Sequence, residues 1–475
     1  MYNGVYFKGK VGRLIMSNLK KSLLYVINRD KFVFIYLLVY FLLQLKFIFV
    51  KFIFWDESVY IGIGKYIFSF GNKGLFESIR PIILSFFSGL FWFLNLDTIL
   101  YSRLFMLLSS LTLLYVFYLI SRKYVDNKMS LFAMIYLSLL PIYFIYSTKI
   151  LTGIFSMLFV LLGFYFFLQD RFYLTSLFLG IATSIRFPSG IYFGLFSIYL
   201  FLILLKKKIS IKRVLIIFSI FMLSISPYFI MMLIKGKNPV LALLKASQHQ
   251  NNIVFKRSLF YYFKNLFILS PALILIFSGL YYCIKNIKKS QGKTLYLLFS
   301  LIIPFLYFVV IRNKQLRFLN LVLPFMILVL FYGLFILIKN SKFLFVLVMI
   351  LLVVSVFMGW RYMDNSFESY IHRTDPDKDV LNLKIDPSKV YLTSSPVFVA
   401  YNDALFIPYY SNITNAYSML SNHPVNLSIY SDEFPCSKLP DEDSCVYKKD
   451  KIISLLKKQR TIYQNKRFIL SEFIS

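Results

Sequence analysis

Long apolar stretches recur along the chain from near its start to about residue 361. The first of them, residues 32–55, is long enough to cross a bilayer, because a hydrocarbon core of about 30 Å needs about 20 helical residues. Short links that are rich in Lys and Arg separate these stretches. The pattern predicts an all-α polytopic membrane protein, with about eleven transmembrane helices in a domain that covers residues 32–361.

The individual spans follow from the limits of each apolar stretch. The stretch at 81–94 gives a helix of about 21 Å, which is too short to cross, and we expect a short peripheral helix there. A sixth span is expected to end before Lys206, and the last three lie between Lys293 and Arg361. The other predicted spans are 32–55, 97–120, 129–146, 150–168, 172–185, 214–234 and 263–284.

The basic residues predict the orientation of the chain. Residues 1–31 form a basic arm, which suits a cytoplasmic segment lying on anionic lipid. Counted from that arm, most Lys and Arg clusters fall on the cytoplasmic side, as the positive-inside rule expects, and counting 81–94 as a span would invert most of them. We therefore predict a multi-pass protein of the cell membrane, with a cytoplasmic N-terminus and with Asp56 and Glu57 outside.

A change to polar composition marks the last part of the chain. Residues 362–475 are predicted to form a small soluble α/β domain on the extracytoplasmic side. Strands are expected at 390–396 and 466–470 and a helix at 449–464. Two glycosylation sequons, at Asn412 and Asn426, and a pairing of Cys436 with Cys445 would suit that side, although whether the two Cys are bonded stays open.

Composition and charge narrow the function. Of 475 residues 59% are hydrophobic, and 53 basic against 21 acidic residues give a net charge of +32. Such an excess suits either a nucleic acid or an anionic membrane surface. Because the basic residues lie in the links and no nucleic-acid motif is present, we expect membrane lipid and no nucleic acid as the partner. No Zn motif and no phosphate-binding Gly loop occurs in the sequence.

Asp56 and Glu57 are the first candidates for chemistry, because carboxylates at the mouth of a span are either a solvated boundary or a functional site. Several cations lie on the same predicted face, against the orienting rule. Singly, each of them suits snorkelling to lipid headgroups. Together with the acidic pair, they predict a site for a phosphate group. These cations are Arg80, Lys149, Arg186, Lys314 and Arg317.

The motif Asp56-Glu57-x-x-Tyr60 after the first span, followed by Arg80-Pro81, resembles the membrane-embedded GT-C glycosyltransferases. The likeness is greatest to the branch of the protein O-mannosyltransferases and aminoarabinose transferases. The family resemblance extends to Ser102-Arg103-Leu104, Leu140-Pro141 and Arg186-Phe187-Pro188.

Three segments depart from the family pattern. Many relatives have Leu-Thr-Asp where this chain has Leu151-Thr152-Gly153, and their double Pro is here Pro81-Ile82. The segment 314–318 is similar to the His-Lys-Glu-x-Arg-Phe signature of lipid-donor mannosyltransferases, but Asn313 and Gln315 replace its His and Glu. The missing Asp at Gly153 removes a possible metal ligand, so no cofactor is certain and a divalent cation remains an open possibility.

The resemblance implies transfer of a monosaccharide from a polyprenyl-phosphate donor to a hydroxyl of a protein, lipid or glycan acceptor at the extracytoplasmic face, with inversion. It makes Asp56 the general base, and Glu57 a group that positions the acceptor or the base. Tyr60 would orient a hydroxyl. The phosphate would bind to Arg80, Arg186 and Arg317, with Lys149 and Lys314 as weaker candidates.

Two other functions remain as alternatives. A transporter or flippase for polyprenyl-linked sugars would also bind polyanions, but it would more naturally show a pseudo-repeat and charges near the middle of the membrane. No such repeat is visible in the sequence. A non-catalytic membrane scaffold or receptor that uses the C-terminal domain is the third possibility. His249, in a predicted polar loop, is expected to be solvated.

Overall fold

The computed structural model describes most of the helical part and some strands: 29–50, 53–251, 257–287, 292–338, 341–371, 385–393, 395–408, 427–431, 460–464 and 468–472. The chain divides into two compact units between Phe47 and Ile48, which are considered separately. The predicted domain limits at 31 and 361 stay predictions. Most of the basic arm, the asparagines of both sequons, the two Cys of the C-terminal domain and residues 449–459 of the predicted helix lie outside the described residues.

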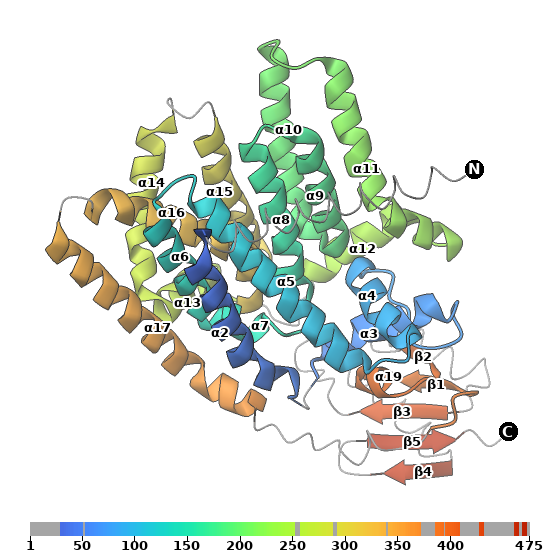
Figure 1. Ribbon diagram of the computed structural model, residues 1–475. Coiled ribbons are helices and arrows are strands. Elements are labelled where there is room, and N and C mark those ends of the chain that lie inside the picture. Colours follow the sequence, from blue (N-terminus) through green and yellow to red (C-terminus); the bar gives the residue numbers. More distant parts are fainter. Residues whose placement is uncertain are drawn as a thin grey trace, which may run out of the picture. The chain divides into compact units, whose positions relative to one another are not determined.

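Helix α2 (Lys31–Ile48), which ends one residue past that division, makes up almost all of what is described of the first unit. The second unit contains the other helices (Figure 1). In chain order they are α3 (Trp55–Phe68), α4 (Ile83–Phe93), α5 (Thr98–Ser121), α6 (Asn127–Leu139), α7 (Pro141–Tyr146), α8 (Thr152–Leu168), α9 (Phe172–Ile185), α10 (Gly190–Leu205), α11 (Ile211–Ile234), α12 (Pro239–Asn251), α13 (Tyr261–Leu269), α14 (Ile276–Lys285), α15 (Lys293–Val310), α16 (Leu323–Ile338), α17 (Lys342–Ile371) and α19 (Val397–Tyr401). Short 3-10 helices are η1 (Phe187–Ser189), η2 (Pro271–Leu275) and η4 (Leu316–Leu321).

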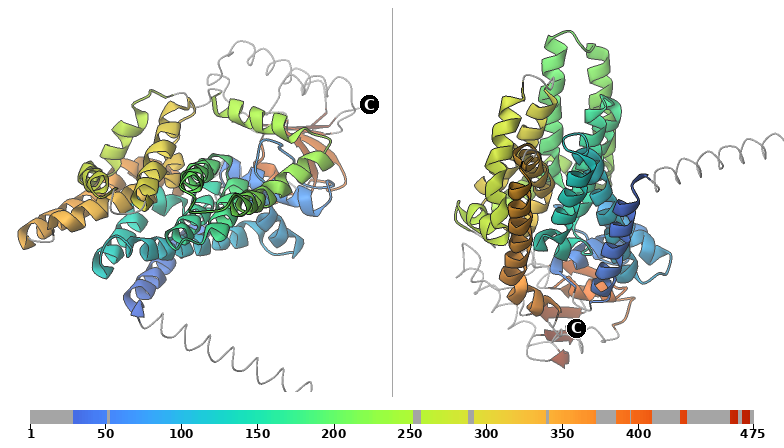
Figure 2. Two further views of the ribbon diagram at one scale, coloured as in Figure 1. Left: turned by 90° about the horizontal axis from the view of Figure 1, so that it is seen from above. Right: turned by 60° about the vertical axis from the view of Figure 1, so that its left-hand side comes forward.

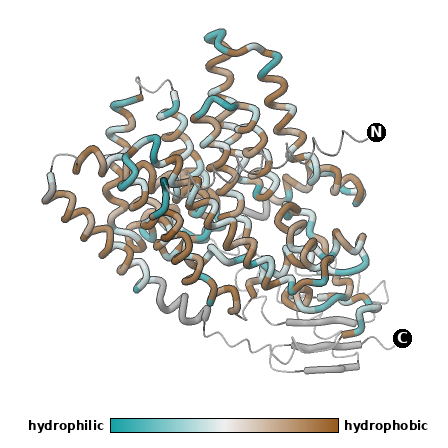
Figure 3. The backbone as a smooth tube through the Cα atoms, in the orientation of Figure 1, coloured by the Kyte–Doolittle hydropathy of each residue, from teal (hydrophilic) through white to brown (hydrophobic). Residues whose placement is uncertain are grey.

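The protein is a mostly helical, polytopic membrane protein. Within the described residues, six helices are long and apolar enough to cross a membrane, and a seventh span results if α13 and η2–α14, which meet at an angle of 111°, count as one. Figure 3 shows hydrophobic residues along most of the helical part. Four further apolar helices, α4, α8, α9 and α16, are shorter than a full span.

The difference from about eleven predicted spans has local causes. The stretch predicted to span at 129–146 is divided into α6 and α7, because Pro141 cannot donate a backbone hydrogen bond and disfavours a helical residue before it. Helices α8 and α9 coincide with two predicted spans but contain only 17 and 14 residues. The short helix expected at 81–94 is present as α4, with 11 residues, and its peripheral position stays a prediction.

The core beneath α3 combines side chains from the first loop and from the spans. Ile61 of α3, Leu84 of α4, Met106 of α5, Phe155 of α8 and Ile185 of α9 belong to one buried cluster. Apolar packing against α4, α5, α8 and α9 therefore fixes the position of α3, which carries the polar residues.

The C-terminal part contains a mixed sheet of five strands in the order β2-β1-β3-β5-β4. Strand β1 is parallel to β2 and β3, whereas β5 is antiparallel to β3 and β4, with Tyr391 opposite Phe406. The sheet lies next to α3 and α4 (Figure 1 and Figure 2). The strands are β1 (Val390–Thr393), β2 (Leu405–Pro408), β3 (Leu427–Ser431), β4 (Arg460–Gln464) and β5 (Phe468–Glu472).

One secondary-structure prediction in this part is wrong. Residues 460–464 were expected at the end of a helix, but they form strand β4 and pair with β5. Thr461, Ile462 and Tyr463 are β-branched or aromatic residues that favour strands once a pairing partner is present. The predicted strand at 390–396 ends at Thr393, because Pro396 instead precedes α19.

Candidate functional site

Helix α3 places Asp56 and Glu57 in its first turn. The Glu57 carboxylate caps this turn, since its Oε2 accepts a hydrogen bond from the Phe54 backbone N–H at 2.8 Å. Successive side chains on a helix point about 100° apart, so the two carboxylates face different surroundings. They therefore have different partners.

Asp56 lies between two arginines. Its Oδ1 is 2.7 Å from Arg80 Nη2, and its Oδ2 is 2.6 Å from Arg317 Nη2. Burial raises the pKa of the Asp56 carboxyl, but the charges and hydrogen bonds of Arg80 and Arg317 outweigh burial and hold it well below its usual value. The side chain is 16% exposed, so the carboxylate is screened from solvent but not sealed from it.

Arg80 is fixed by two further contacts. Its Nε lies 3.1 Å from Glu77 Oε2, and its guanidinium lies 5.6 Å from the centre of the Tyr60 ring. Tyr60 is thus at the site, packed against the cation. The sequence reasoning missed Glu77, although its position three residues before Arg80 is a usable signal, because that spacing favours an ion pair.

Arg186 follows α9 and adds a third cation. Its guanidinium lies 5.0 Å from the Phe318 ring and 5.8 Å from the Phe308 ring. Burial and the nearby charge of Arg317 lower the pKa of Arg186 to about 10. A Cβ atom at Gly153 would lie 3.2 Å from Arg186 Nη1, so glycine leaves space beside the guanidinium at the position where many relatives carry Asp.

The charges in this group do not balance. Arg80, Arg186 and Arg317 bring three positive charges, whereas Asp56 and Glu77 bring two negative ones. No ion pair joins Arg186 to any residue that the structure describes. Two buried atoms, Arg317 Nε and Asn320 Oδ1, lack a hydrogen-bond partner within the described part of the chain. Such a group suits an anion that also carries polar groups.

Glu57 belongs to a second, inner cluster. It is fully buried, its Oε1 accepts a hydrogen bond from the Ile150 backbone N–H at 2.9 Å, and its Oε2 lies 3.6 Å from Arg103 Nη2. Arg103 also donates to the backbone oxygens of Ile48 and Val50. This cluster ties the start of α3 to α5 and to the segment before α8. Sequence reasoning noted Arg103 as a motif residue but assigned it no role.

The two remaining predicted lysines lie apart from the Asp56 carboxylate. Lys149 is fully buried near Glu57, with its Nζ 5.8 Å from the Phe54 ring, and burial lowers its pKa despite the charge of Glu57. Lys314 Nζ donates to the Ile311 carbonyl oxygen at 2.6 Å.

His249 lies in α12, and the structure does not describe its side chain. In the described ranges, no group of three or more His, Cys, Asp or Glu is placed to hold a metal ion.

Comparison with known proteins shows which fold positions these residues. No protein-family model matches the chain, and no curated protein matches it in sequence. Among solved structures, ArnT from Cupriavidus metallidurans bound to undecaprenyl phosphate is similar over 94% of this chain and 98% of its own, with a TM-score of 0.64 and 12% identity. The chain has the GT-C fold. The fold expected from the sequence motifs is therefore confirmed.

Two other structures support the same fold. The apo state of the same ArnT matches with a TM-score of 0.63 over 94% of this chain and 98% of its own, at 12% identity. An oligosaccharyltransferase from Archaeoglobus fulgidus, tethered to an acceptor peptide with an NVT sequon, matches 90% of this chain and 72% of its own. Its TM-score is 0.56 and its identity is 10%. At such identities the likeness establishes the GT-C fold and leaves the reaction to the residues.

Proposed function

We propose that this chain is a glycosyltransferase that moves a monosaccharide from a polyprenyl-phosphate donor to an acceptor hydroxyl at the extracytoplasmic membrane face. The observation that carries the proposal is the Asp56 carboxylate bound between Arg80 and Arg317. Arg186 adds a cation that forms no ion pair with a carboxylate of the described residues. The fold shared with an ArnT that binds undecaprenyl phosphate supports a lipid-linked phosphate as the anion.

The chemistry assigns one task to each charge. The acceptor oxygen attacks the anomeric carbon while the bond from that carbon to the phosphate oxygen breaks, and the configuration inverts. Asp56 takes the proton of the acceptor hydroxyl. Polyprenyl phosphate departs with the bonding electrons, and the guanidinium groups of Arg80, Arg186 and Arg317 stabilise the charge that it gains.

The ion pairs of Asp56 impose an order on these events. Two arginines lower the pKa of the Asp56 carboxyl, which makes it a weak base while both are bound to it. A donor phosphate competes for the same guanidinium groups, and sharing them weakens their hold on Asp56. Donor binding therefore precedes and promotes removal of the acceptor proton.

Glu57 has a supporting task in this proposal. Because its carboxylate is fully buried and engaged with backbone N–H groups, it positions Asp56 by fixing the first turn of α3. Arg103 forms an ion pair with it, and Lys149 lies near it as a second cation. Lys314 stays a weaker candidate for phosphate binding, since its ammonium is turned toward a carbonyl oxygen.

The membrane topology belongs to the same proposal. We place the N-terminus in the cytoplasm, and the Asp56 site and the C-terminal domain outside, with about eleven crossings. In these, α8, α9 and α16 serve as short spans, and α6 with α7 serves as a broken one. Hydrogen bonds between spans suit such packing, for example from Ser184 of α9 to the Ser224 carbonyl of α11 at 2.8 Å.

Labelled polyprenyl-phosphate sugars supplied to membranes with and without the protein test the function. Label on an acceptor, lost in Asp56→Asn and kept in Asp97→Asn, supports the transferase. Asp97 is an exposed cap of α5, and Asn preserves such a cap. Labelled lipid that changes leaflet without product would identify a flippase. Neither transfer of label nor movement of lipid would favour a non-catalytic scaffold. Full activity in Asp56→Asn would remove Asp56 as the base.

A further inference from the structure

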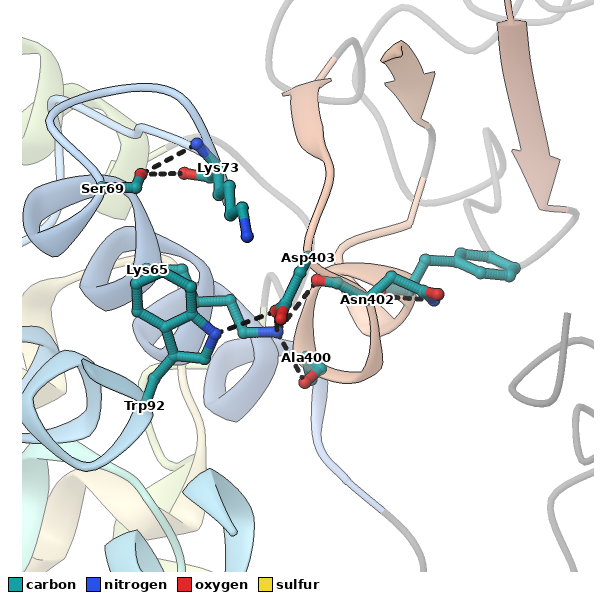
Figure 4. Close-up of polar contacts among 8 residues, drawn as sticks. Lys65, Ser69, Lys73, Trp92, Ala400, Asn402 and Asp403 are labelled. Carbon is teal, nitrogen blue, oxygen red and sulfur yellow. Dashed lines mark hydrogen bonds and ion pairs between the residues drawn. The ribbon is translucent and has the colours of Figure 1, made fainter. Parts of the chain in front are cut away.

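The last turn of α3 carries a buried lysine whose bonds all lead to the C-terminal domain (Figure 4). The Lys65 side chain is only 3% exposed. Its Nζ lies 3.1 Å from the Ala400 oxygen, 2.9 Å from the Asn402 oxygen and 3.0 Å from Asp403 Oδ1. An ammonium group has three N–H donors, so these three acceptors use every one of them.

Asp403 joins a second helix to the same point. Its Oδ1 also accepts a hydrogen bond from Trp92 Nε1 at 2.9 Å, and Trp92 lies near the end of α4. One carboxylate of the C-terminal domain thus holds the last turns of α3 and α4 (Figure 4). The loop between these helices contains Arg80, which binds Asp56.

Apolar contacts reinforce this junction. Val59 and Ile63 of α3 share a buried cluster with Phe398 and Val399 of α19. A Cβ atom at Gly62 would lie 2.8 Å from Val399 Cγ1, so only glycine permits this approach of the two helices. The backbone of the following loop joins the sheet edge, because the Gly74 N–H donates to the Ala404 oxygen at 2.8 Å and the Gly74 oxygen accepts from the Phe406 N–H at 2.7 Å.

Helix α4 holds another side of α3. A Cβ atom at Gly64 would lie 2.4 Å from the Ser85 oxygen, and one at Gly89 would lie 2.4 Å from the Gly64 oxygen, so α3 and α4 cross in backbone contact. Helix α3 is therefore held between α4 and α19. Asp56 stands nine residues before Lys65 on this helix, about 14 Å away along its axis.

We propose that Lys65 and Asp403 are positioning residues, through which the C-terminal domain fixes α3 so that Asp56 stands between Arg80 and Arg317. Apolar packing alone would hold the domain against α3, whereas a buried ammonium is costly and stabilises one register only when its directional bonds are all made. The consequence for catalysis rests on the proposed transferase function, and the placement of α3 does not.

The test uses the full-length protein in lipid nanodiscs, with Lys65→Met and Asp403→Ala as the variants. Asp386→Ala is the matched control, because Asp386 lies in the same domain and its carboxylate binds Ser388 of its own loop. Asp403→Asn keeps an oxygen that accepts from Lys65 and Trp92. Two quantities are measured: turnover with a polyprenyl-phosphate sugar, and hydrogen exchange of the amides at 58–64 in α3.

We expect kcat to fall about tenfold to hundredfold in Lys65→Met and Asp403→Ala, because small displacements of a catalytic group have large effects on rate. The donor KM should change less than kcat, since two of the three phosphate-binding arginines, Arg186 and Arg317, lie outside α3 and the loop that follows it. Exchange in α3 should quicken by about tenfold. Asp403→Asn should retain most of the turnover, and Asp386→Ala all of it.

Unchanged kcat or unchanged exchange in both variants would overturn the positioning role. If one variant does not fold, the other decides; the Asp403 side chain is 48% exposed, so its truncation leaves no sealed cavity. A wild-type protein that transfers no sugar would overturn the proposed function alone. The exchange comparison with Asp386→Ala would then decide by itself whether Lys65 and Asp403 fix α3.

Discussion

The two ends of α3 both carry a charged side chain bound by an opposite charge. At only one end are all the hydrogen-bonding groups and charges matched. Lys65 has three donors and three acceptors, and it is almost fully buried. Asp56 is partly exposed, and around it a positive charge remains in excess and Arg317 Nε lacks a partner within the described residues. A saturated ion pair stabilises one conformation, whereas an unsaturated one can exchange its partners with a ligand. Under the two proposals, the first turn of α3 is the binding end and its last turn is the anchoring end.

The largest effect should come from removing a cation at the binding end. Arg317→Gln should lower kcat about a hundredfold to a thousandfold, which is typical for loss of one donor to a developing oxyanion. The kcat of Arg317→Lys should lie between those of the wild type and Arg317→Gln, since Lys keeps the charge and loses the planar guanidinium. The measurement is turnover in nanodiscs, with Arg312→Gln as the control, because Arg312 is exposed in the same loop. Equal losses of kcat in Arg317→Gln and Arg312→Gln would show that Arg317 has no specific role in transfer.

A carboxylate added at Gly153 should close the binding end. In Gly153→Asp the new side chain would lie against the Arg186 guanidinium and neutralise the excess charge. Polyprenyl phosphate should then bind about tenfold to hundredfold more weakly, in line with the strength of a charge-assisted hydrogen bond. Equilibrium binding measures this, with Gly153→Asn as the control of equal size. If the two variants bind equally, Arg186 does not hold the phosphate.

The pH dependence of turnover tests the exchange of partners at Asp56. In the free protein its pKa is depressed below the usual value of about 3.9, so its contribution to stability is complete above that pH and is lost only as the pH falls below it. A bound donor that shares the arginines raises this pKa. We therefore expect the acidic limb of kcat to lie at higher pH than that of kcat/KM. Coincident limbs would show that the phosphate leaves both ion pairs intact.

The smallest effect should come from the anchoring end. Trp92→Phe removes one hydrogen bond to Asp403 and leaves the Lys65 bonds in place, which should cost about 1 kcal/mol of stability. Thermal unfolding should show a small decrease in Tm, and turnover should stay within about twofold of the wild type. A loss of turnover as large as that of Asp403→Ala would mean that α4, rather than Lys65, transmits the position of the C-terminal domain.

The binding end could be found from the sequence because its arginines depart from the positive-inside rule. Arg80, Arg186 and Arg317 stand out as cations on the predicted extracytoplasmic face, where the positive-inside rule expects few. The structure places all three around one carboxylate region. The same rule also selects Lys149 and Lys314, since it identifies the end of a helix and not the direction of a side chain. Those two lie beside Glu57 and a backbone carbonyl, respectively.

The anchoring end gave no such signal. Two of the three partners of Lys65 are backbone oxygens, which leave no trace in residue type, and they lie more than 330 positions away along the chain. The position of Glu57 next to Asp56 in the sequence predicts that both belong to the same site. The helical geometry instead turns Glu57 inward, toward the Ile150 backbone N–H. Strand β4 required knowledge of its partner β5, because pairing overrides local helix preference.

The charge excess at the binding end has a consequence for what happens after transfer. A donor phosphodiester carries one negative charge, which matches the net charge of the three arginines, Asp56 and Glu77. The departing phosphate monoester carries up to two, with a second pKa near 6. If Asp56 has just accepted a proton, the site has also gained one positive charge and holds the product more tightly than it held the substrate. Under the proposed function, loss of that proton restores the original balance and weakens the hold of the site on the spent lipid carrier.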